Sequence, residues 1–392
     1  EVPGEWRAGW LNLYRFWREG GLGNLHLIMA SKFRRFGPIY RDKLGVYESV
    51  NIISPGDAAT LFQAEGTLPE RFSVPPWVAY RDFRNKPYGV LLKTGPAWRS
   101  DRLLLNKEVL SPEVAATFVP LLSQVAEDFV GRARAQARLS GGDSWTGDFS
   151  HELFRFALES VCHVLYGQRL GLLQDFVQPE AQRFIEAVAQ MFHTTAPMLY
   201  LPPALLRHLN TRTWRHHVQA WDAIFGQADK CIQGVYRDLR LRRKSPQEYL
   251  GILGNLILSA KLPLEDIRAS VTEMMAGGVD TTSMTLQWAL LELARSPGVQ
   301  EQLRAEVLAA KRDTGGDRAA MLKATPLLKA AIKETLRLHP VAVTLQRYTT
   351  HEVILQRYRI PPKTLVQVAL YAMGRDPAVF PGPEQFHPQH WL

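Results

Sequence analysis

The chain has 392 residues, of which 46% are hydrophobic and 22% are charged, and this balance allows a large buried core and excludes an intrinsically disordered protein. Its formal net charge of +9 favours anionic partners, but charge alone does not choose among nucleic acid, an acidic protein and an anionic membrane surface. The sequence has no apolar run of the roughly 18 residues that a membrane-spanning helix needs, so we expect any membrane contact to be peripheral.

The two cysteines, Cys162 and Cys231, have neither the spacing of a zinc site nor that of a disulfide framework. We expect both to be small buried residues of a protein in a reducing compartment. Residues 1–10 contain no hydrophobic signal core and no leader rich in Arg and Ser. Either the protein needs no targeting segment, or the segment is absent from this sequence.

The first quarter of the chain begins with aromatic residues that recur every three or four positions: Trp6, Trp10, Tyr14 and Trp17. This spacing predicts an amphipathic helix, and we expect its aromatic side chains to pack in the ordinary way. Two β-type runs on either side of a glycine, 39–44 and 49–53, predict a hairpin. The hydroxyl of Ser54, followed by proline and by Asp57, predicts the start of a helix.

Helical periodicity dominates the middle of the chain, from 112 to about 258, with short polar breaks at 140–143 and 242–246. A second long and mostly apolar helix is predicted from 263 to 295, where a Ser-Pro pair ends it.

The pattern then changes to β-type runs at 341–348, 353–355 and 364–370, followed by a tail rich in Pro and Phe at 380–391. No repeat or low-complexity linker divides the chain. The sequence therefore predicts one domain over 1–392, mainly α-helical with a small β region.

The most informative segment is Gly277-Gly278-Val279-Asp280-Thr281-Thr282, in the middle of the second long helix. Each interior glycine costs about 1 kcal/mol relative to alanine, so a gain must offset it. Missing side chains let a flat ligand or a small molecule approach the backbone, and a threonine hydroxyl can draw a carbonyl out of the helical ladder. An acid beside an alcohol is a plausible proton relay. A kink made only for helix packing is the alternative.

Glu334 and Arg337 place a carboxylate and a guanidinium on one helical face. The same spacing recurs in pairs that we expect to be solvated: Glu152/Arg155, Glu180/Arg183, Glu265/Arg268, Glu292/Arg295 and Glu301/Arg304. The apolar setting of Glu334 and Arg337 predicts burial instead, and a buried pair needs further hydrogen bonds.

Trp98 and Arg102 lie one helical turn apart, so an indole N–H and a guanidinium face the same side. This geometry suits carboxylates or phosphates. The alternative is a surface helix whose Trp packs inward.

Together these residues resemble a known family. Gly277 to Thr282 resembles the oxygen-activation motif of the haem-thiolate monooxygenases of the cytochrome P-450 superfamily, Glu334-x-x-Arg337 is similar to their helical Glu-x-x-Arg pair, and Trp98-x-x-x-Arg102 to their haem-propionate clamp. The order and spacing of the three motifs agree, and the resemblance covers essentially the whole chain. Longer tracts, 75–80, 179–185, 190–194 and 283–288, are similar to the mitochondrial members that cleave the side chain of cholesterol.

The resemblance implies a cytochrome P-450 fold and haem b as the cofactor, with electrons from NADPH arriving through a reductase and a [2Fe-2S] ferredoxin. It implies that Asp280 and Thr281 supply protons for oxygen activation. Four roles follow for the other residues: Trp98, Arg102 and Arg347 at the haem propionates, Gly277 and Gly278 beside the haem, Trp77, Met191, Phe192, Thr344, Gln346 and Gln367 around a sterol, and Lys329 and Lys333 at the ferredoxin.

Two departures from the family pattern are visible. The family's cysteine loop, Phe-x-x-Gly-x-x-x-Cys, follows the tail motif, whereas this chain ends at Leu392. We therefore expect that the axial thiolate and the last helix are missing, that no residue here binds the metal, and that the chain as it stands is inactive, since neither cysteine stands in a suitable context. His390 occupies a position where the family usually has arginine, and we expect a weaker network with Glu334 and Arg337.

The resemblance implies that the full-length protein converts cholesterol to pregnenolone, peripherally bound to the matrix side of the mitochondrial inner membrane, with 197–206 as the membrane-contacting stretch. Three alternatives remain: another mitochondrial steroid or vitamin D hydroxylase, a truncated sterol- or partner-binding form without catalysis, and a basic nucleic-acid binder. No recognition motif supports the last of these.

Overall fold

The computed structural model describes residues 1–142, 144–176, 179–241 and 249–392. The predicted break at 242–246 lies outside the described residues, as does the last residue of the break at 140–143. The long helices begin and end close to the predicted positions. Their bounds are α1 Gly9–Arg18, α2 Gly21–Phe36, α3 Pro55–Ala64, α4 Pro75–Arg84, α5 Gly95–Leu105, α6 Pro112–Leu139, α7 Phe149–Tyr166, α8 Pro179–Met198, α9 Pro203–His208, α10 Arg212–Arg240, α11 Gly251–Ser259, α12 Leu264–Arg295, α13 Pro297–Asp313, α14 Arg318–Lys323, α15 Pro326–Leu338 and α16 Leu370–Met373.

Two short helical segments of other types complete the set, a π-helical turn η1 at Asn106–Leu110 and a 3₁₀ turn η2 at Pro388–Trp391. The strands are β1 Gly4–Glu5, β2 Ile39–Leu44, β3 Tyr47–Ile52, β4 Glu70–Arg71, β5 Thr344–Tyr348, β6 Val353–Leu355, β7 Tyr358–Ile360 and β8 Leu365–Ala369. The predicted hairpin is confirmed as β2 and β3, and the later β-type runs as β5, β6 and β8.

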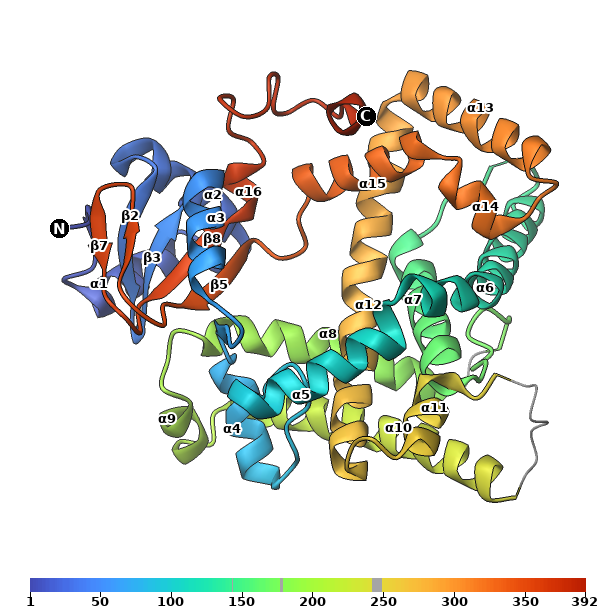
Figure 1. Cartoon of the computed structure of the whole chain (residues 1–392), viewed down its shortest axis with the longest axis horizontal. Coiled ribbons are helices and arrows are strands. Elements are labelled where there is room, and N and C mark those ends of the chain that lie inside the picture. Colours follow the sequence, from blue (N-terminus) through green and yellow to red (C-terminus); the bar gives the residue numbers. More distant parts are fainter. Residues whose placement is uncertain (143, 177–178, 242–248) are drawn as a thin grey trace.

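The strands gather at one end of the molecule with the N-terminal helices α1, α2 and α3 and the short C-terminal helix α16, and most of the other helices pack around or beside α12 (Figure 1). Six strands form one sheet in the order β1-β2-β3-β8-β5-β4, and β6 pairs with β7 separately. The turn between β2 and β3 needs the positive φ of Gly45, +59°, which glycine adopts without steric cost. All five residues of β8 are buried, as expected of a strand with neighbours on both edges.

Local sequence signals explain several helix starts. The side chains of Ser54, Ser111, Asp148 and Thr211 each accept a hydrogen bond from a backbone N–H of the first turn. Each satisfies a donor that the helix itself leaves free. The predicted start at Ser54 is thereby confirmed. Tight packing of α7, α8 and α10 against α12 buries Val279 and Met275 completely.

The N-terminal aromatic residues do not pack as expected. Trp10, Tyr14 and Trp17 are 57%, 60% and 41% exposed, while Leu13 and Phe16 form the buried face of α1. The prediction of ordinary packing was wrong for these three because leucine and phenylalanine positions one residue away supply the core contacts. An exposed aromatic stripe beside basic residues is typical of an interfacial surface.

Among the residues that the structure describes, no single helix combines the length and hydropathy needed to span a membrane. Gly95–Leu110 and Pro112–Leu139, bent by 52° at their junction, meet these criteria only as a pair.

Candidate active site

The two interior glycines of α12 serve different purposes. A Cβ on Gly277 would meet nothing within 4 Å, so this face of the helix is open. A Cβ on Gly278 would lie 2.7 Å from Cγ2 of Val161, so the missing side chain lets α7 approach α12 closely. The hydroxyl of Thr281 donates to the carbonyl oxygen of Gly277 at 2.7 Å. The predicted capture of a carbonyl by a threonine is confirmed, and it lies beside the open face.

Asp280 is partly buried next to this open face. Among the described residues, no donor bonds its Oδ1, although the atom is buried. Burial raises the pKa of Asp280 to about 6 because the charged form loses hydration. A carboxyl with such a pKa exchanges protons readily near neutral pH.

Basic side chains gather around Trp98. The buried Nε1 of Trp98 has no hydrogen-bond acceptor among the described residues, and Arg71 lies 4.8 Å from the centre of its ring. The pKa of Arg71 is lowered by burial and then by the charges of Arg347 and Arg102. Three guanidinium groups and an unpaired indole N–H therefore lie near one another, a donor set that suits an anion.

Cross-strand pairing sharpens this conclusion. Arg71 of β4 and Arg347 of β5 stand directly opposite each other, and like charges in such a pair are destabilising. Glu65 accepts a hydrogen bond from Nε of Arg347 at 2.5 Å and offsets part of the repulsion. Sequence patterns did not single out Arg71, because β4 has only two residues and carries no periodicity.

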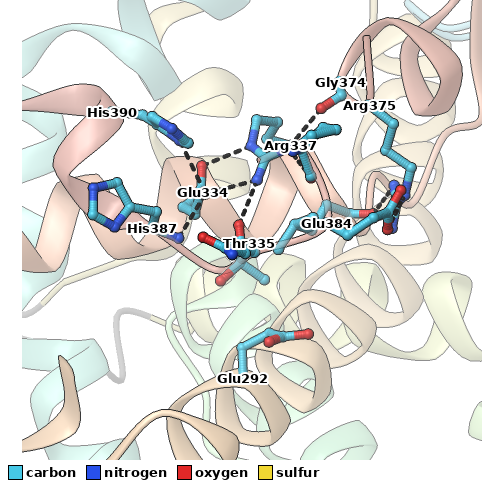
Figure 2. A network of polar contacts seen from close by, with 12 residues as sticks. Glu292, Glu334, Thr335, Arg337, Gly374, Arg375, Glu384, His387 and His390 are labelled. Atoms are coloured by element: carbon cyan, nitrogen blue, oxygen red, sulfur yellow. Dashed lines mark hydrogen bonds and ion pairs between the residues drawn. The ribbon is translucent and has the colours of Figure 1, made fainter. Parts of the chain in front are cut away.

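The Glu334–Arg337 pair is buried, as predicted, and its partners extend across the tail (Figure 2). Nε and Nη2 of Arg337 each donate to the carboxylate of Glu334 at 2.8 Å. Its Nη1 donates to the carbonyl oxygens of Gly374, just after α16, at 2.6 Å and of Pro383, in the tail, at 2.7 Å, and its Nη2 also donates to that of Gln385 at 2.9 Å. Every charge-bearing nitrogen therefore has a partner.

Glu334 also accepts hydrogen bonds from the backbone N–H of His387 and the indole of Trp391, at 2.8 and 2.9 Å. Burial alone would raise the pKa of Glu334, but these bonds and Arg337 lower it below its ordinary value. His390 joins through Nδ1, 3.2 Å from Oε1 of Glu334. His390 thus makes one imidazole contact with Glu334, at the position where the family usually has an arginine.

Two of the pairs predicted to be solvated are not. The side chains of Glu152 and Arg155 are only 15% and 22% exposed, and Nε of Arg132 donates to the carboxylate of Glu152 at 2.6 Å. Glu292 is only 7% exposed, because its Oε1 lies 2.8 Å from Nε2 of His339 and 4.0 Å from Nη1 of Arg295. The ring of His339 stacks on Trp288 at 4.0 Å. The i, i+3 spacing showed the contact with Arg295 but could not reveal a partner on another helix. Both cysteines, in contrast, are buried as predicted.

The predicted sterol-lining residues form two groups. In the first, Trp77 lies 6.0 Å from Phe192 between ring centres and donates to the hydroxyl of Thr195 at 2.9 Å. Thr195 in turn donates to the carbonyl oxygen of Met191 at 2.6 Å. This group joins α4 to α8 and is mainly apolar.

The second group lies on the sheet. Oε1 of Gln367 accepts from Thr344 at 3.3 Å and Gln346 at 3.5 Å. Its amide nitrogen donates to the side chains of Ser49 and Asn51.

Tyr47 connects the second group to the chain just after α8. Its hydroxyl donates to Oε1 of Gln367 at 2.9 Å, and its ring lies 5.7 Å, centre to centre, from that of Tyr200, just after α8. The sequence did not reveal Tyr47, Ser49 or Asn51 as site residues, because they lie on a strand that also looked purely structural.

Lys329 and Lys333 are exposed on α15, one turn apart, as their spacing predicted. Lys333 lies 5.7 Å from the ring centre of Trp391. The basic face of α15 is thus joined to the tail that carries the buried network.

Comparison with known proteins decides the family. The model of the family described as "Cytochrome P450" matches residues 3–392. The chain belongs to the cytochrome P450 family. It is 58% identical over 392 residues to a cholesterol side-chain cleavage enzyme, mitochondrial, of Oncorhynchus mykiss, covering all of this chain and 76% of the relative. The human enzyme of the same name is 54% identical, with all of this chain and 75% of the relative covered.

Solved cytochromes P450 share the fold. A retinoic acid-bound cyanobacterial CYP120A1 superposes with a TM-score of 0.75 at 18% identity, covering 99% of this chain and 81% of that one. A zebra fish cytochrome P450 with abiraterone gives 0.72 at 19% identity, covering 94% and 82%. The predicted fold class is thereby confirmed.

The family implies a haem, and the residues present fit one. The open face at Gly277 leaves room for a flat group, and the unpaired indole of Trp98 beside Arg71, Arg102 and Arg347 suits the carboxylates at its edge. Among the described residues the indole N–H of Trp98 has no acceptor, so it is free to bond such a carboxylate.

Proposed function

We propose that the protein, in its complete form, cleaves the side chain of cholesterol to give pregnenolone, by hydroxylating two adjacent carbons and breaking the bond between them. The observation that carries the proposal is the 58% identity, over every residue of this chain, to an enzyme of that name. The two groups of predicted sterol-lining residues support it too, because one offers an apolar wall and the other a polar cluster: Trp77, Met191 and Phe192 on the helices, and Thr344, Gln346 and Gln367 on the sheet.

When bound, haem b supplies the activation of dioxygen. Trp98, Arg102 and Arg347 would hold its propionates, and Gly277 and Gly278 would lie beside it. Asp280 takes protons from solvent and passes them toward Thr281, since its raised pKa keeps the protonated form available. The apolar wall around Phe192 excludes water and orients the sterol, while the amide of Gln367 and its neighbours fix the polar end.

The two cysteines of the chain are poor candidates for the thiolate ligand. Cys162 and Cys231 are both buried between helices, and burial raises the pKa of both thiols. Burial in apolar surroundings disfavours the thiolate, so neither residue is suited to bind iron.

Electrons reach the enzyme from NADPH through a reductase and an acidic [2Fe-2S] ferredoxin of the adrenodoxin type. Lys329 and Lys333 present two exposed ammonium groups on one face of α15. Complementary charge at such a surface speeds encounter with an acidic partner.

We place the enzyme peripherally on the matrix side of the mitochondrial inner membrane. The predicted contact stretch 197–206 contains exposed Leu205, and Tyr200 within it packs 5.3 Å from Phe16 of α1. This stretch therefore packs against α1, the helix that carries the exposed stripe of Trp10, Tyr14 and Trp17. Aromatic side chains of this kind favour the headgroup region of a bilayer.

Reconstitution tests the proposal. The complete protein, incubated with cholesterol, NADPH, reductase and ferredoxin, should release pregnenolone, and a reaction without ferredoxin should not. Hydroxylation of another steroid or of vitamin D without any pregnenolone would favour a different mitochondrial hydroxylase. Absence of a shifted absorbance with carbon monoxide after reduction would overturn the oxygenase assignment itself.

A further inference from the structure

We propose that Glu273, oriented by Arg81, is a positioning residue that fixes the segment 89–93 against α12 and thereby holds the haem-facing side chains of α5 in place. This inference rests on the proposed function, because it takes Trp98 and Arg102 to contact a haem. Neither Glu273 nor Arg81 belongs to the motifs that identify the family in this sequence.

The carboxylate of Glu273 accepts hydrogen bonds from the backbone of segment 89–93. Its Oε1 accepts the N–H of Gly89 at 3.0 Å, and its Oε2 accepts the N–H of Leu91 at 2.8 Å. Between them, the N–H of Val90 donates to Oγ of Ser270 at 3.2 Å. Three successive backbone donors thus bond side chains of one helix. Hydrogen bonds to a carboxylate are among the stronger ones in proteins.

Only a residue without a Cβ fits at position 89 beside Glu273. A Cβ at this position would lie 2.3 Å from Oε2 of Glu273 and 2.8 Å from the backbone of Ala269. Any side chain would therefore displace the carboxylate. The glycine has no other evident role, since its φ is not positive.

Arg81 holds Glu273 from the other side. Its guanidinium is fully buried, with Nη2 3.6 Å from Oε1 of Glu273, and lies 4.0 Å from the ring centre of Trp221 and 4.6 Å from that of Phe225. Among the described residues its nitrogens form no hydrogen bond. Burial lowers the pKa of Arg81 and raises that of Glu273. Arginine nevertheless stays protonated in proteins, so a cation faces the carboxylate.

Segment 89–93 contacts the residues of the candidate haem site. Lys93 bridges Asp101 of α5, at 2.6 Å, and Asp266 of α12, at 2.8 Å. Arg71 donates to the carbonyl oxygens of Val90 and Lys93, and its guanidinium also lies over the ring of Trp98. A shift of the segment therefore moves the arginine and indole groups that suit the haem edge.

The carboxylate that bonds this segment lies one helical turn from the open face of α12 at Gly277. Glu273, at i−4 from Gly277, lies on the same side of the helix and lines one cavity of about 390 Å³ together with Gly277 and Arg102. One face of α12 carries four residues at spacings of four, three and four: Asp266, Ser270, Glu273 and Gly277. The face that bonds segment 89–93 is therefore also the face that is open at Gly277.

Substitution of the carboxylate by its amide tests the inference in the complete holoenzyme. Glu273→Gln keeps the size but offers one acceptor oxygen where two N–H groups need one each. We expect the rate of haem transfer to excess apomyoglobin to rise about tenfold, as for the loss of one charge-assisted hydrogen bond. Resonance Raman bands of the propionate groups should shift, because Trp98 and Arg71 change position.

Glu265→Gln is the matched control, since Glu265 is an exposed carboxylate on the same helix, and it should change neither quantity. Gly89→Ala should reproduce the Glu273→Gln phenotype with the carboxylate retained. The double variant should be no worse than the more affected single variant, because both act through one contact.

The outcomes separate the two claims. A wild-type protein without the shifted carbon monoxide band refutes the proposed function. A normal wild type, with haem loss and Raman bands unchanged in both Glu273→Gln and Gly89→Ala, refutes the positioning role alone. Additive effects in the double variant would also overturn it.

Discussion

Two buried polar regions lie on packed neighbouring helices, α15 and α12, and they differ in how completely their groups are paired. Around Glu334 and Arg337, the carboxylate and the guanidinium bond each other, the backbone at Gly374 and the tail at His387 and Trp391. On α12 and α5, Oδ1 of Asp280 and the indole N–H of Trp98 have no hydrogen-bond partner among the described residues. A saturated network indicates a structural role, whereas unpaired buried groups indicate a place for a ligand.

The largest expected effect would come from breaking the saturated region. Glu334→Gln leaves the buried guanidinium of Arg337 without its counter-charge, and we expect the free energy of unfolding to fall by about 3–5 kcal/mol. Urea denaturation followed by circular dichroism measures it. Because the folded pKa of Glu334 is lowered, its contribution is present above the ordinary pKa of glutamate and is lost as the pH falls through the folded value.

Glu301→Gln serves as the control for this prediction, since Glu301 forms an exposed pair with Arg304. Its effect should stay below about 1 kcal/mol. Equal losses in the two variants would show that burial of the Glu334 network contributes nothing special.

An intermediate effect on stability, opposite in sign at Gly277 and Gly278, would sharpen the comparison at the open face of α12. Gly278→Ala places a methyl group against the stiff side chain of Val161 and should destabilise the fold by about 1–3 kcal/mol. Gly277→Ala meets open space and should stabilise the haem-free chain by about 1 kcal/mol, through helix propensity.

Thermal unfolding of both glycine variants without haem checks the signs, and haem titration then separates them further. The methyl of Gly277→Ala should weaken haem binding despite its gain in stability. Stabilisation accompanied by unchanged haem affinity would mean that the open face at Gly277 is not used by the cofactor.

The smallest expected effect on stability concerns Asp280, whose carboxyl Oδ1 has no donor among the described residues. Asp280 has a folded pKa raised to about 6, so its charge destabilises the fold by an amount that grows from the ordinary pKa of aspartate and is complete above about 6. Asp280→Asn removes this cost and should stabilise the protein at pH 7.5 by roughly 1 kcal/mol, since partial exposure screens the charge. At pH 4 the variant and the parent should unfold alike. A difference that does not change with pH would argue against a raised pKa.

Sequence patterns were sufficient where one segment carries its own signal. The length of α12, the Pro-marked helix starts and the burial of Glu334 and Arg337 all follow from periodicity and apolar setting. Signals were insufficient for β1, β4 and β7, which have only two or three residues and take their place from neighbouring strands. Contacts between distant segments, such as Arg71 opposite Arg347 or Glu292 with His339, depend on tertiary packing that spacing does not encode. Trp10 was misplaced for a related reason, since a helical stripe of aromatic residues does not say which side faces the core.

The contact between the sheet and the end of α8 has a mechanical consequence. Tyr47 donates a hydrogen bond to Gln367 and meets the ring of Tyr200 edge to face, and the N–H of Val46 donates to the backbone carbonyl oxygen of Tyr200 at 3.3 Å. A hydrogen bond weakens steeply when its geometry is lost, so the backbone bond resists a sliding of the two rings over one another. The end of α8 is therefore tied to the turn between β2 and β3, and a displacement of this helix end would have to break that bond or carry the turn with it.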